Sequence, residues 1–316
     1  MKFTVSPAPH VHAAQTTQRI MLAVITALMP CLAAAVYWFG PRALLVTGVS
    51  AASCVLFELL AELLAKRPLT INDLSAVVTG LILGLNLPVT APWWLIVIGA
   101  AVAILLVKQL FGGIGYNFLN PALAARAVLL ASWPGHLTNF TLPMTGGGTD
   151  AVSSATFLTG NYKAPMLDLF LGKIPGTMGE VCKLAILVGL LYLLLKRVIT
   201  WDVPVSYLGS FVVLAFLFGY ARDGFTGWAD MLLLPVLSGG VLFGAVFMAT
   251  DYVTNPMTTR GRLLYGIGCG LITAVIRYYG SYPEGVTYAI LLMNIATPLI
   301  DRGFKPHVYG EVKQHG

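Results

Sequence analysis

The sequence predicts an all-α, polytopic membrane protein with about ten transmembrane helices, arranged in two inverted repeats that contain interrupted helices. Composition, long apolar runs and a weak internal repeat support this fold class. The 316 residues are 57% hydrophobic and only 10% charged, far from the balance of a soluble globular domain. A bilayer requires about 20 mainly apolar residues per helical crossing, and the backbone there must satisfy its own hydrogen bonds. Long apolar runs are therefore interpreted as helices.

The predicted helices follow one another along the chain. The run at residues 74–87 is too short to cross a bilayer comfortably, and it contains Gly80 and Gly84 and is followed by Pro88 and Pro92. This pattern predicts a broken or half-crossing helix. The longer runs lie at residues 20–39, 43–64, 93–110, 118–133, 182–195, 205–219, 231–247, 263–279 and 286–300.

The internal repeat relates residues 80–92 to residues 244–256 without a gap. In each half a hydrophobic helix follows and ends near a cation, Lys108 or Arg277. A true duplication predicts membrane repeats at residues 1–133 and 182–316, separated by a loop at 134–181, with cofactor or substrate sites at the repeat interface. The alternative is that glycine and proline are simply common in membrane helices. The matched pairs are Gly80 with Gly244, Val89 with Val253, Thr90 with Thr254, and Pro92 with Pro256.

The distribution of lysine and arginine predicts the orientation, because cytoplasmic loops carry an excess of positive charge. Both termini are expected in the cytoplasm and the loop 134–181 outside it. This asymmetry explains the net charge of +6, and no basic patch with interleaved aromatic residues indicates a nucleic acid partner. The inner cations are Lys2, Arg19, Lys66, Arg67, Lys108, Lys196, Arg197, Arg260, Arg262, Arg302 and Lys305.

A polar segment of small residues stands out in the loop 134–181. Its pattern is Asp, two residues, Ser, one residue, Ala and Thr, and it resembles the site at which one family of membrane subunits carries FMN bound to the threonine hydroxyl through a phosphoester. The alternative is a helix start or surface turn with Ser153 as the N-cap. The residues of the motif are Asp150, Ser153, Ser154, Ala155 and Thr156.

Further segments carry the same resemblance. They are the stretch 108–115 with Asn117, Asn120 and Pro121 after it, the stretch 251–262, and the ending 298–301. Together they resemble the NqrB/RnfD family, and especially its RnfD branch, whose members are membrane flavin subunits of ion-translocating Rnf complexes. Ser154 stands where the family often has glycine, and Phe157 where RnfD often has proline. The short loop and the absence of the NqrB N-terminal extension favour RnfD.

The resemblance implies an electron-carrying flavoprotein subunit of a Na⁺- or H⁺-translocating ferredoxin:NAD⁺ oxidoreductase in the inner (plasma) membrane. It implies FMN on Thr156, attached by a flavin transferase that reads the motif, and it suggests a second, noncovalent flavin such as riboflavin at the repeat interface. The expected partners are membrane lipid, a second flavin subunit and iron–sulfur subunits. The chain itself has no nucleotide-binding motif for NAD and no cluster motif for ferredoxin, so it is not catalytically complete alone.

Several polar residues near predicted helix ends are further candidates. Asp251, with Thr254 and Thr258, forms a hydroxyl-rich helix break that is typical of a second flavin pocket or an ion path, and the alternative is a solvated loop. Asn117, Asn120 and Lys108 lie near the mouth of another helix. Lys108 and Arg277 are expected to extend toward a membrane interface. Asp73 and Arg126 are the other ionisable candidates at membrane depth.

The cysteines and histidines predict no metal site in this chain. Cys31, Cys54, Cys182 and Cys269 form no Cys-x-x-Cys pair, which favours buried free thiols over a cluster shared with another chain. The histidines lack metal-ligand spacing. The competing functions are an NqrB-like subunit of a sodium-pumping NADH:quinone reductase and a passive channel or transporter for small solutes.

Overall fold

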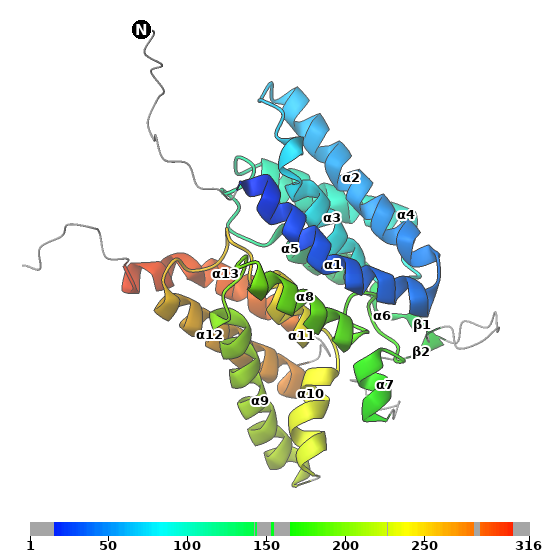
Figure 1. Cartoon of the computed structure of the whole chain (residues 1–316), viewed down its shortest axis with the longest axis vertical. Coiled ribbons are helices and arrows are strands. Elements are labelled where there is room, and N and C mark those ends of the chain that lie inside the picture. Colours follow the sequence, from blue (N-terminus) through cyan, green and yellow to red (C-terminus); the bar gives the residue numbers. More distant parts are fainter. Residues whose placement is uncertain are drawn as a thin grey trace, which may run out of the picture.

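The computed structural model describes residues 16–141, 143, 153–154, 165–225, 227–280 and 285–305, and most of these are helical (Figure 1). The first half contains α1 (Thr17–Phe39), α2 (Arg42–Leu64), the 3-10 turn η1 (Ile71–Asp73), α3 (Ser75–Leu85), α4 (Trp93–Ala101), the π-helix η2 (Val102–Gln109) and α5 (Pro121–Ser132). The connecting segment contains α6 (Pro134–Thr138), the strands β1 (Phe140–Thr141) and β2 (Ser153–Ser154), and α7 (Met166–Leu171). The second half contains α8 (Lys183–Leu195), α9 (Asp202–Asp223), the π-helix η4 (Ala229–Leu233), α10 (Leu234–Leu237), α11 (Val241–Phe243), the π-helix η5 (Gly244–Met248), α12 (Thr259–Tyr279) and α13 (Val286–Gly303).

Every apolar run of the sequence coincides with helix, and the protein is an all-α polytopic membrane protein. Within the described ranges, α1, α2 and α9 are long and apolar enough to cross a bilayer, and a bent helix pair adds a fourth candidate. Shorter apolar helices, including α3, α5 and α8, have 10–17 residues. The count of ten crossings stays a prediction.

Two of the predicted helices depart from a full straight crossing, one because it is short and one because it is broken. The predicted short helix is confirmed as α3, which has 11 residues and is therefore about 16 Å long. Gly80 allows it to pack directly on α2, since a Cβ at this position would lie 2.5 Å from the Ala51 Cα. The run 231–247 is broken at residues 238–240, where the helix pair bends by 68°.

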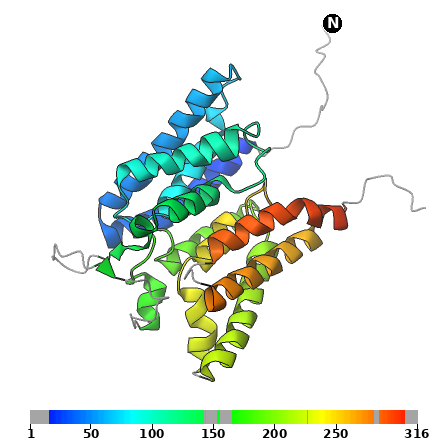
Figure 2. The same cartoon turned by 180° about the vertical axis from the view of Figure 1, so that it is seen from behind.

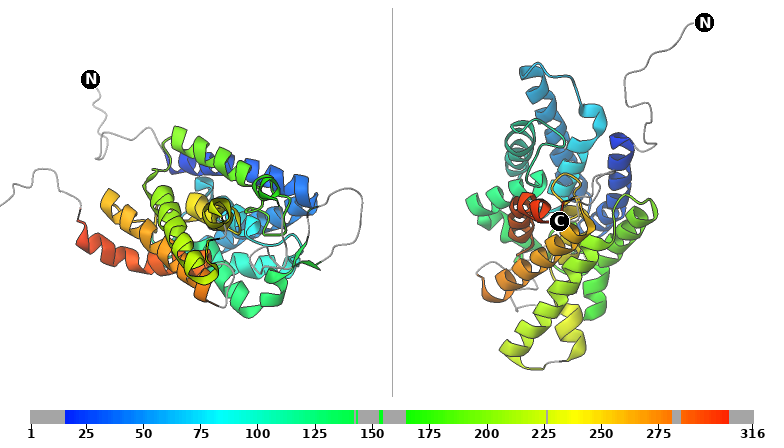
Figure 3. Two further views of the ribbon diagram at one scale, coloured as in Figure 1. Left: turned by 90° about the horizontal axis from the view of Figure 1, so that it is seen from below. Right: turned by 90° about the vertical axis from the view of Figure 1, so that its left-hand side faces the viewer.

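The helices form two groups that occupy opposite ends of the molecule, α1–α5 at one end and α9–α13 at the other (Figures 1 and 2). Two further views show the same division (Figure 3). The groups meet where α1 packs along α8 and where α5 contacts α13. Gly189 brings α8 close to α1, because a Cβ there would lie 2.5 Å from the carbonyl oxygen of Ala27. The predicted division into two repeats and their inverted symmetry stay predictions.

Candidate functional site

The attachment motif is joined to the membrane bundle by a short antiparallel hairpin. β2 pairs with β1, and the partners are Phe140 with Ser154 and Thr141 with Ser153. These two serines therefore lie in a strand, and the alternative of a helix start is wrong for them. Asp150, Ala155 and Thr156 lie outside the described residues.

The hairpin is anchored at the end of the first group of helices. Leu137 of α6 and Phe140 of β1 are both buried. The Thr90 hydroxyl, from the turn between α3 and α4, donates to the Asn139 carbonyl oxygen at 3.3 Å. Ser154 is thus held beside a packed part of the bundle, two residues before Thr156.

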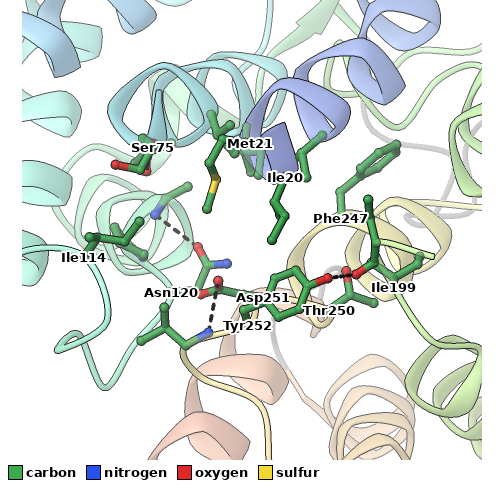
Figure 4. Close-up of a pocket in the computed structure, with 18 of the residues that line it drawn as sticks. Ile20, Met21, Ser75, Ile114, Asn120, Ile199, Phe247, Thr250, Asp251 and Tyr252 are labelled. Atoms are coloured by element: carbon green, nitrogen blue, oxygen red, sulfur yellow. Dashed lines mark hydrogen bonds between the residues drawn. The ribbon is translucent and has the colours of Figure 1, made fainter. Parts of the chain in front are cut away.

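A pocket lies between the two groups of helices (Figure 4). Its walls come from α1, α3, α5, η5 and the turn after α8, and they include Ile20 and Phe247 on the apolar side. The pocket has a volume of about 90 Å³. The empty space grows to about 800 Å³ when the open solvent at its mouth is included. Four predicted site residues line it, namely Lys108, Asn117, Asn120 and Asp251.

Asn120 has a structural role at this pocket. Its side-chain oxygen caps α5 by accepting from the N–H groups of Ala122 at 3.1 Å and Leu123 at 3.2 Å. Its amide nitrogen donates to the carbonyl oxygen of Met248 at 3.3 Å, at the end of η5. One side chain therefore joins the two groups of helices. The buried Asn117 amide donates to the Leu119 carbonyl oxygen at 3.0 Å.

Asp251 is half-buried in the turn that follows η5, and both its predicted role and the alternative of a solvated loop stay predictions. Its carboxylate accepts from the Val253 N–H at 3.5 Å and from the Thr254 hydroxyl at 3.3 Å. Burial raises the pKa of this carboxyl, and both hydrogen bonds act in the opposite direction. Thr258 does not line the pocket and instead caps α12 through the Gly261 N–H at 3.1 Å.

Lys108 does not extend to an interface as predicted. Its side chain is buried, and its Nζ lies 2.5 Å from Glu58 Oε1 and 2.6 Å from Ser75 Oγ. Ser75 Oγ in turn donates to Asp73 Oδ1 at 2.5 Å. A buried cation of this kind needs a paired anion, because an isolated charge in a low dielectric is costly.

Sequence reasoning missed Glu58, the partner of Lys108. Glu58 is fully buried, and its Oε2 has no hydrogen-bond partner. A glutamate inside an apolar run was the available signal, since an acid at membrane depth is usually paired.

The other membrane cations also have partners within the protein. Arg277 donates to the Pro235 carbonyl oxygen at 2.6 Å and lies 5.0 Å from the centre of the Phe211 ring, so its predicted extension to an interface is wrong. Arg126 is buried and donates to Asn86 Oδ1 at 3.1 Å. These contacts connect neighbouring helices, and neither arginine lines the pocket.

Cys31, Cys54 and Cys269 are buried and Cys182 is half-buried, and none of the four forms a disulfide, while the choice between free thiols and a cluster shared with another chain stays a prediction. In the part of the chain that the structure describes, no group of three or more His, Cys, Asp or Glu side chains could hold a metal ion.

The chain aligns with known proteins over nearly its whole length. Residues 4–310 match the model of the NQR2, RnfD, RnfE family. The chain is 48% identical to the D subunit of the Na(+)-translocating ferredoxin:NAD(+) oxidoreductase complex of Acetobacterium woodii, with 99% of this chain and 97% of that protein covered. It is 39% identical to the D subunit of the proton-translocating ferredoxin:NAD(+) oxidoreductase complex of Clostridium ljungdahlii, with 98% and 96% covered. The D subunit of the ion-translocating oxidoreductase complex of Cellvibrio japonicus is 37% identical, with 97% and 94% covered. The chain therefore belongs to the NQR2, RnfD, RnfE family.

Proposed function

We propose that this chain is the D-type subunit of an ion-translocating ferredoxin:NAD⁺ oxidoreductase and carries electrons through FMN bound covalently to Thr156. The observation that carries the proposal is the motif from Asp150 to Thr156, whose Ser153 and Ser154 pair with β1, in a chain 48% identical to a D subunit of such a complex. Asp150, Ser153, Ser154 and Ala155 form the sequence that a flavin transferase reads.

The threonine hydroxyl suits this role chemically. A phosphoester to Thr156 uses the FMN phosphate for attachment and leaves the isoalloxazine ring free to enter a pocket and exchange electrons. The flavin supplies the redox chemistry when bound, and the protein supplies position and electrostatics. The short side chains of Ser153, Ser154 and Ala155 before Thr156 give the modifying enzyme access to the backbone.

Substitution of Thr156 tests the attachment. Thr156→Ala is expected to abolish in-gel flavin fluorescence and to lower the intact mass by one FMN less one water, because only Thr156 has Ala immediately before it, Ser three residues before it and Asp six residues before it. Thr156→Ser should keep some flavin, since a hydroxyl remains. Thr159→Ala removes a hydroxyl outside the motif, and as the matched control it should keep the full signal. Covalent flavin on Thr156→Ala would contradict the assignment.

We also propose that the pocket between the two groups of helices holds a second, noncovalent flavin such as riboflavin. The pocket has apolar walls and a few polar groups, which is typical of sites for organic ligands. The pocket volume of about 90 Å³ lies below the usual range of roughly 300–1,000 Å³ for such sites, so side chains must move apart as a flavin ring enters. Val24→Trp fills the pocket, and it should remove acid-extractable flavin while fluorescence from Thr156 stays.

An ion path through the same pocket is favoured by Asp251, a half-buried carboxylate beside the Thr254 hydroxyl. In this case Asp251→Ala weakens ion-coupled electron transfer and leaves both flavins in place. Transport at the wild-type rate in an assembled complex would return Asp251 to a structural role.

The proposed assembly supplies what this chain lacks. A second flavin subunit and iron–sulfur subunits provide the sites for NAD and ferredoxin, and the chain lies in the inner (plasma) membrane with both termini in the cytoplasm. Aromatic side chains at helix ends support helices that cross a bilayer, because Trp and Tyr are enriched at both membrane interfaces, whereas the orientation itself rests on the distribution of lysine and arginine. Trp38, Trp94, Trp133 and Trp228 lie at helix ends that the orientation places outside.

A further inference from the structure

A groove between α1 and α8 forms a second site, apart from the flavin pocket. The two helices are closest where Gly189 meets the backbone at Ala27, and the groove lies beyond this crossing, toward the start of α1 and the end of α8. It has a volume of about 270 Å³. From the crossing, Arg19 is eight residues away on α1 and Lys196 seven residues away on α8, which is about 11 Å along each helix.

The lining of the groove combines positive charge with an apolar surface. Arg19 and Lys196 bring one cation from each helix, and both side chains are exposed. Among the described residues that line the groove, none is acidic. Leu22 continues the same face of α1 toward the membrane interior and is also exposed, at 54%.

The N-terminus of α1 adds to the attraction for an anion, whereas the C-terminus of α8 beside Lys196 carries a partial negative charge that acts in the opposite direction. The first turn of α1 contains no acidic residue, and the partial positive charge of a helix N-terminus favours a negative group. The Lys196 Nζ lies 5.9 Å from the centre of the Tyr192 ring, which orients the ammonium group along the groove.

We propose that this groove binds one anionic phospholipid, with its headgroup phosphate between Arg19 and Lys196 and an acyl chain along Leu22. Basic pockets between membrane helices are typical sites for anionic headgroups. A free phosphate ion would use the two cations but would leave the apolar face without a partner, whereas a lipid uses both. The site does not depend on flavin attachment at Thr156.

The position of the groove also gives the lipid a structural role. Ile20 and Val198 line both the groove and the flavin pocket. A lipid in the groove therefore packs on the outer side of two residues whose other side faces the pocket. Bound lipid is expected to stabilise this wall.

Native mass spectrometry of the full chain, titrated in detergent with dioleoyl phosphatidylglycerol, tests the site. Wild type should bind one tightly held phosphatidylglycerol and should bind phosphatidylcholine more weakly. Each cation near a membrane surface strengthens the binding of an anionic lipid about fivefold. The loss of both cations in Arg19→Gln with Lys196→Gln should therefore weaken the tight binding about 30-fold. Arg260→Gln with Arg302→Gln removes the same charge outside the groove and should bind like wild type.

The exchange Arg19→Lys with Lys196→Arg keeps both charges and should keep the lipid, which tests the site even if the neutral variant does not fold. Equal affinity of wild type for phosphatidylglycerol and phosphatidylcholine would overturn the proposal. So would equal affinity of wild type and the neutral variant for phosphatidylglycerol. Complete displacement of the lipid by millimolar inorganic phosphate would show that the groove recognises the free ion instead.

Discussion

At the scale of single residues, the pair of Lys108 and Glu58 shows how a charge is tolerated inside this bundle. The ammonium and carboxylate groups are 2.5 Å apart and both side chains are buried. Gln109 and Ser75 add hydrogen bonds to the two charges, at 3.1 and 2.6 Å. The pair thus links α2, η2 and the start of α3.

Lys108→Met should destabilise the protein by about 3–5 kcal/mol, because it leaves the buried Glu58 carboxylate without its cation. The double variant with Glu58→Gln should recover part of this loss. Thermal unfolding in detergent measures both. A single variant as stable as wild type would show that the pair does not hold the helices together.

The half-buried Asp251 predicts a dependence of stability on pH. Its pKa in the folded state lies above the unfolded value of 3.8, so the folded protein prefers the protonated form. The stabilisation is complete below the unfolded pKa and is lost as the pH rises through the raised folded pKa. Asp251→Asn should remove this loss, as measured by unfolding midpoints at several pH values. The exposed Asp230→Asn is the control, and a pH profile unchanged in Asp251→Asn would contradict the argument.

At the scale of elements, close packing of α3 on α2 depends on the absence of a side chain at Gly80. Gly80→Ala should destabilise the protein by about 1–3 kcal/mol, because the new Cβ meets backbone atoms that cannot move aside. Gly48 on α2 provides a matched control, since nothing lies within 4 Å of a Cβ there. Gly48→Ala should be neutral or stabilising by up to about 1 kcal/mol through helix propensity. Equal unfolding midpoints for the two variants would contradict the packing argument.

The helices could be predicted from sequence because a membrane leaves the backbone few alternatives to helical hydrogen bonding. The length of the apolar run and the prolines after it indicate the short α3. The break at residues 238–240 was missed, although Gly239 and Gly240 were visible inside the run. The hairpin could not be predicted, because the partner of Ser154 is Phe140, and two-residue strands have no detectable alternation. Local patterns therefore identified elements, and pairings distant in sequence escaped them.

The same limit applies to the pocket. The internal repeat predicted a site between the halves, and Lys108, Asn117, Asn120 and Asp251 do line one pocket. Their roles depend on partners far away in sequence, such as Glu58 for Lys108 and Met248 for Asn120. Spacing alone does not distinguish a ligand-binding side chain from one that caps a helix.

At the scale of the whole molecule, the predicted orientation places the connecting segment outside the cytoplasm. Lys173 is an exposed residue of this segment, and Lys305 is an exposed residue after α13. Lys173→Cys should react with a membrane-impermeant maleimide in intact cells, whereas Lys305→Cys should react only in inverted vesicles. The native cysteines contribute little background, because three of the four are buried. The opposite labelling pattern would reverse the orientation.

The pairing of Ser154 with Phe140 also limits how far an attached flavin can travel. From a fixed Ser154, the two residues to Thr156 span at most about 7 Å when fully extended. Any greater reach must come from the ribityl phosphate of the cofactor itself. The hairpin is therefore the anchor point of a short tether. The redox partner of a flavin on Thr156 must come to this end of the bundle.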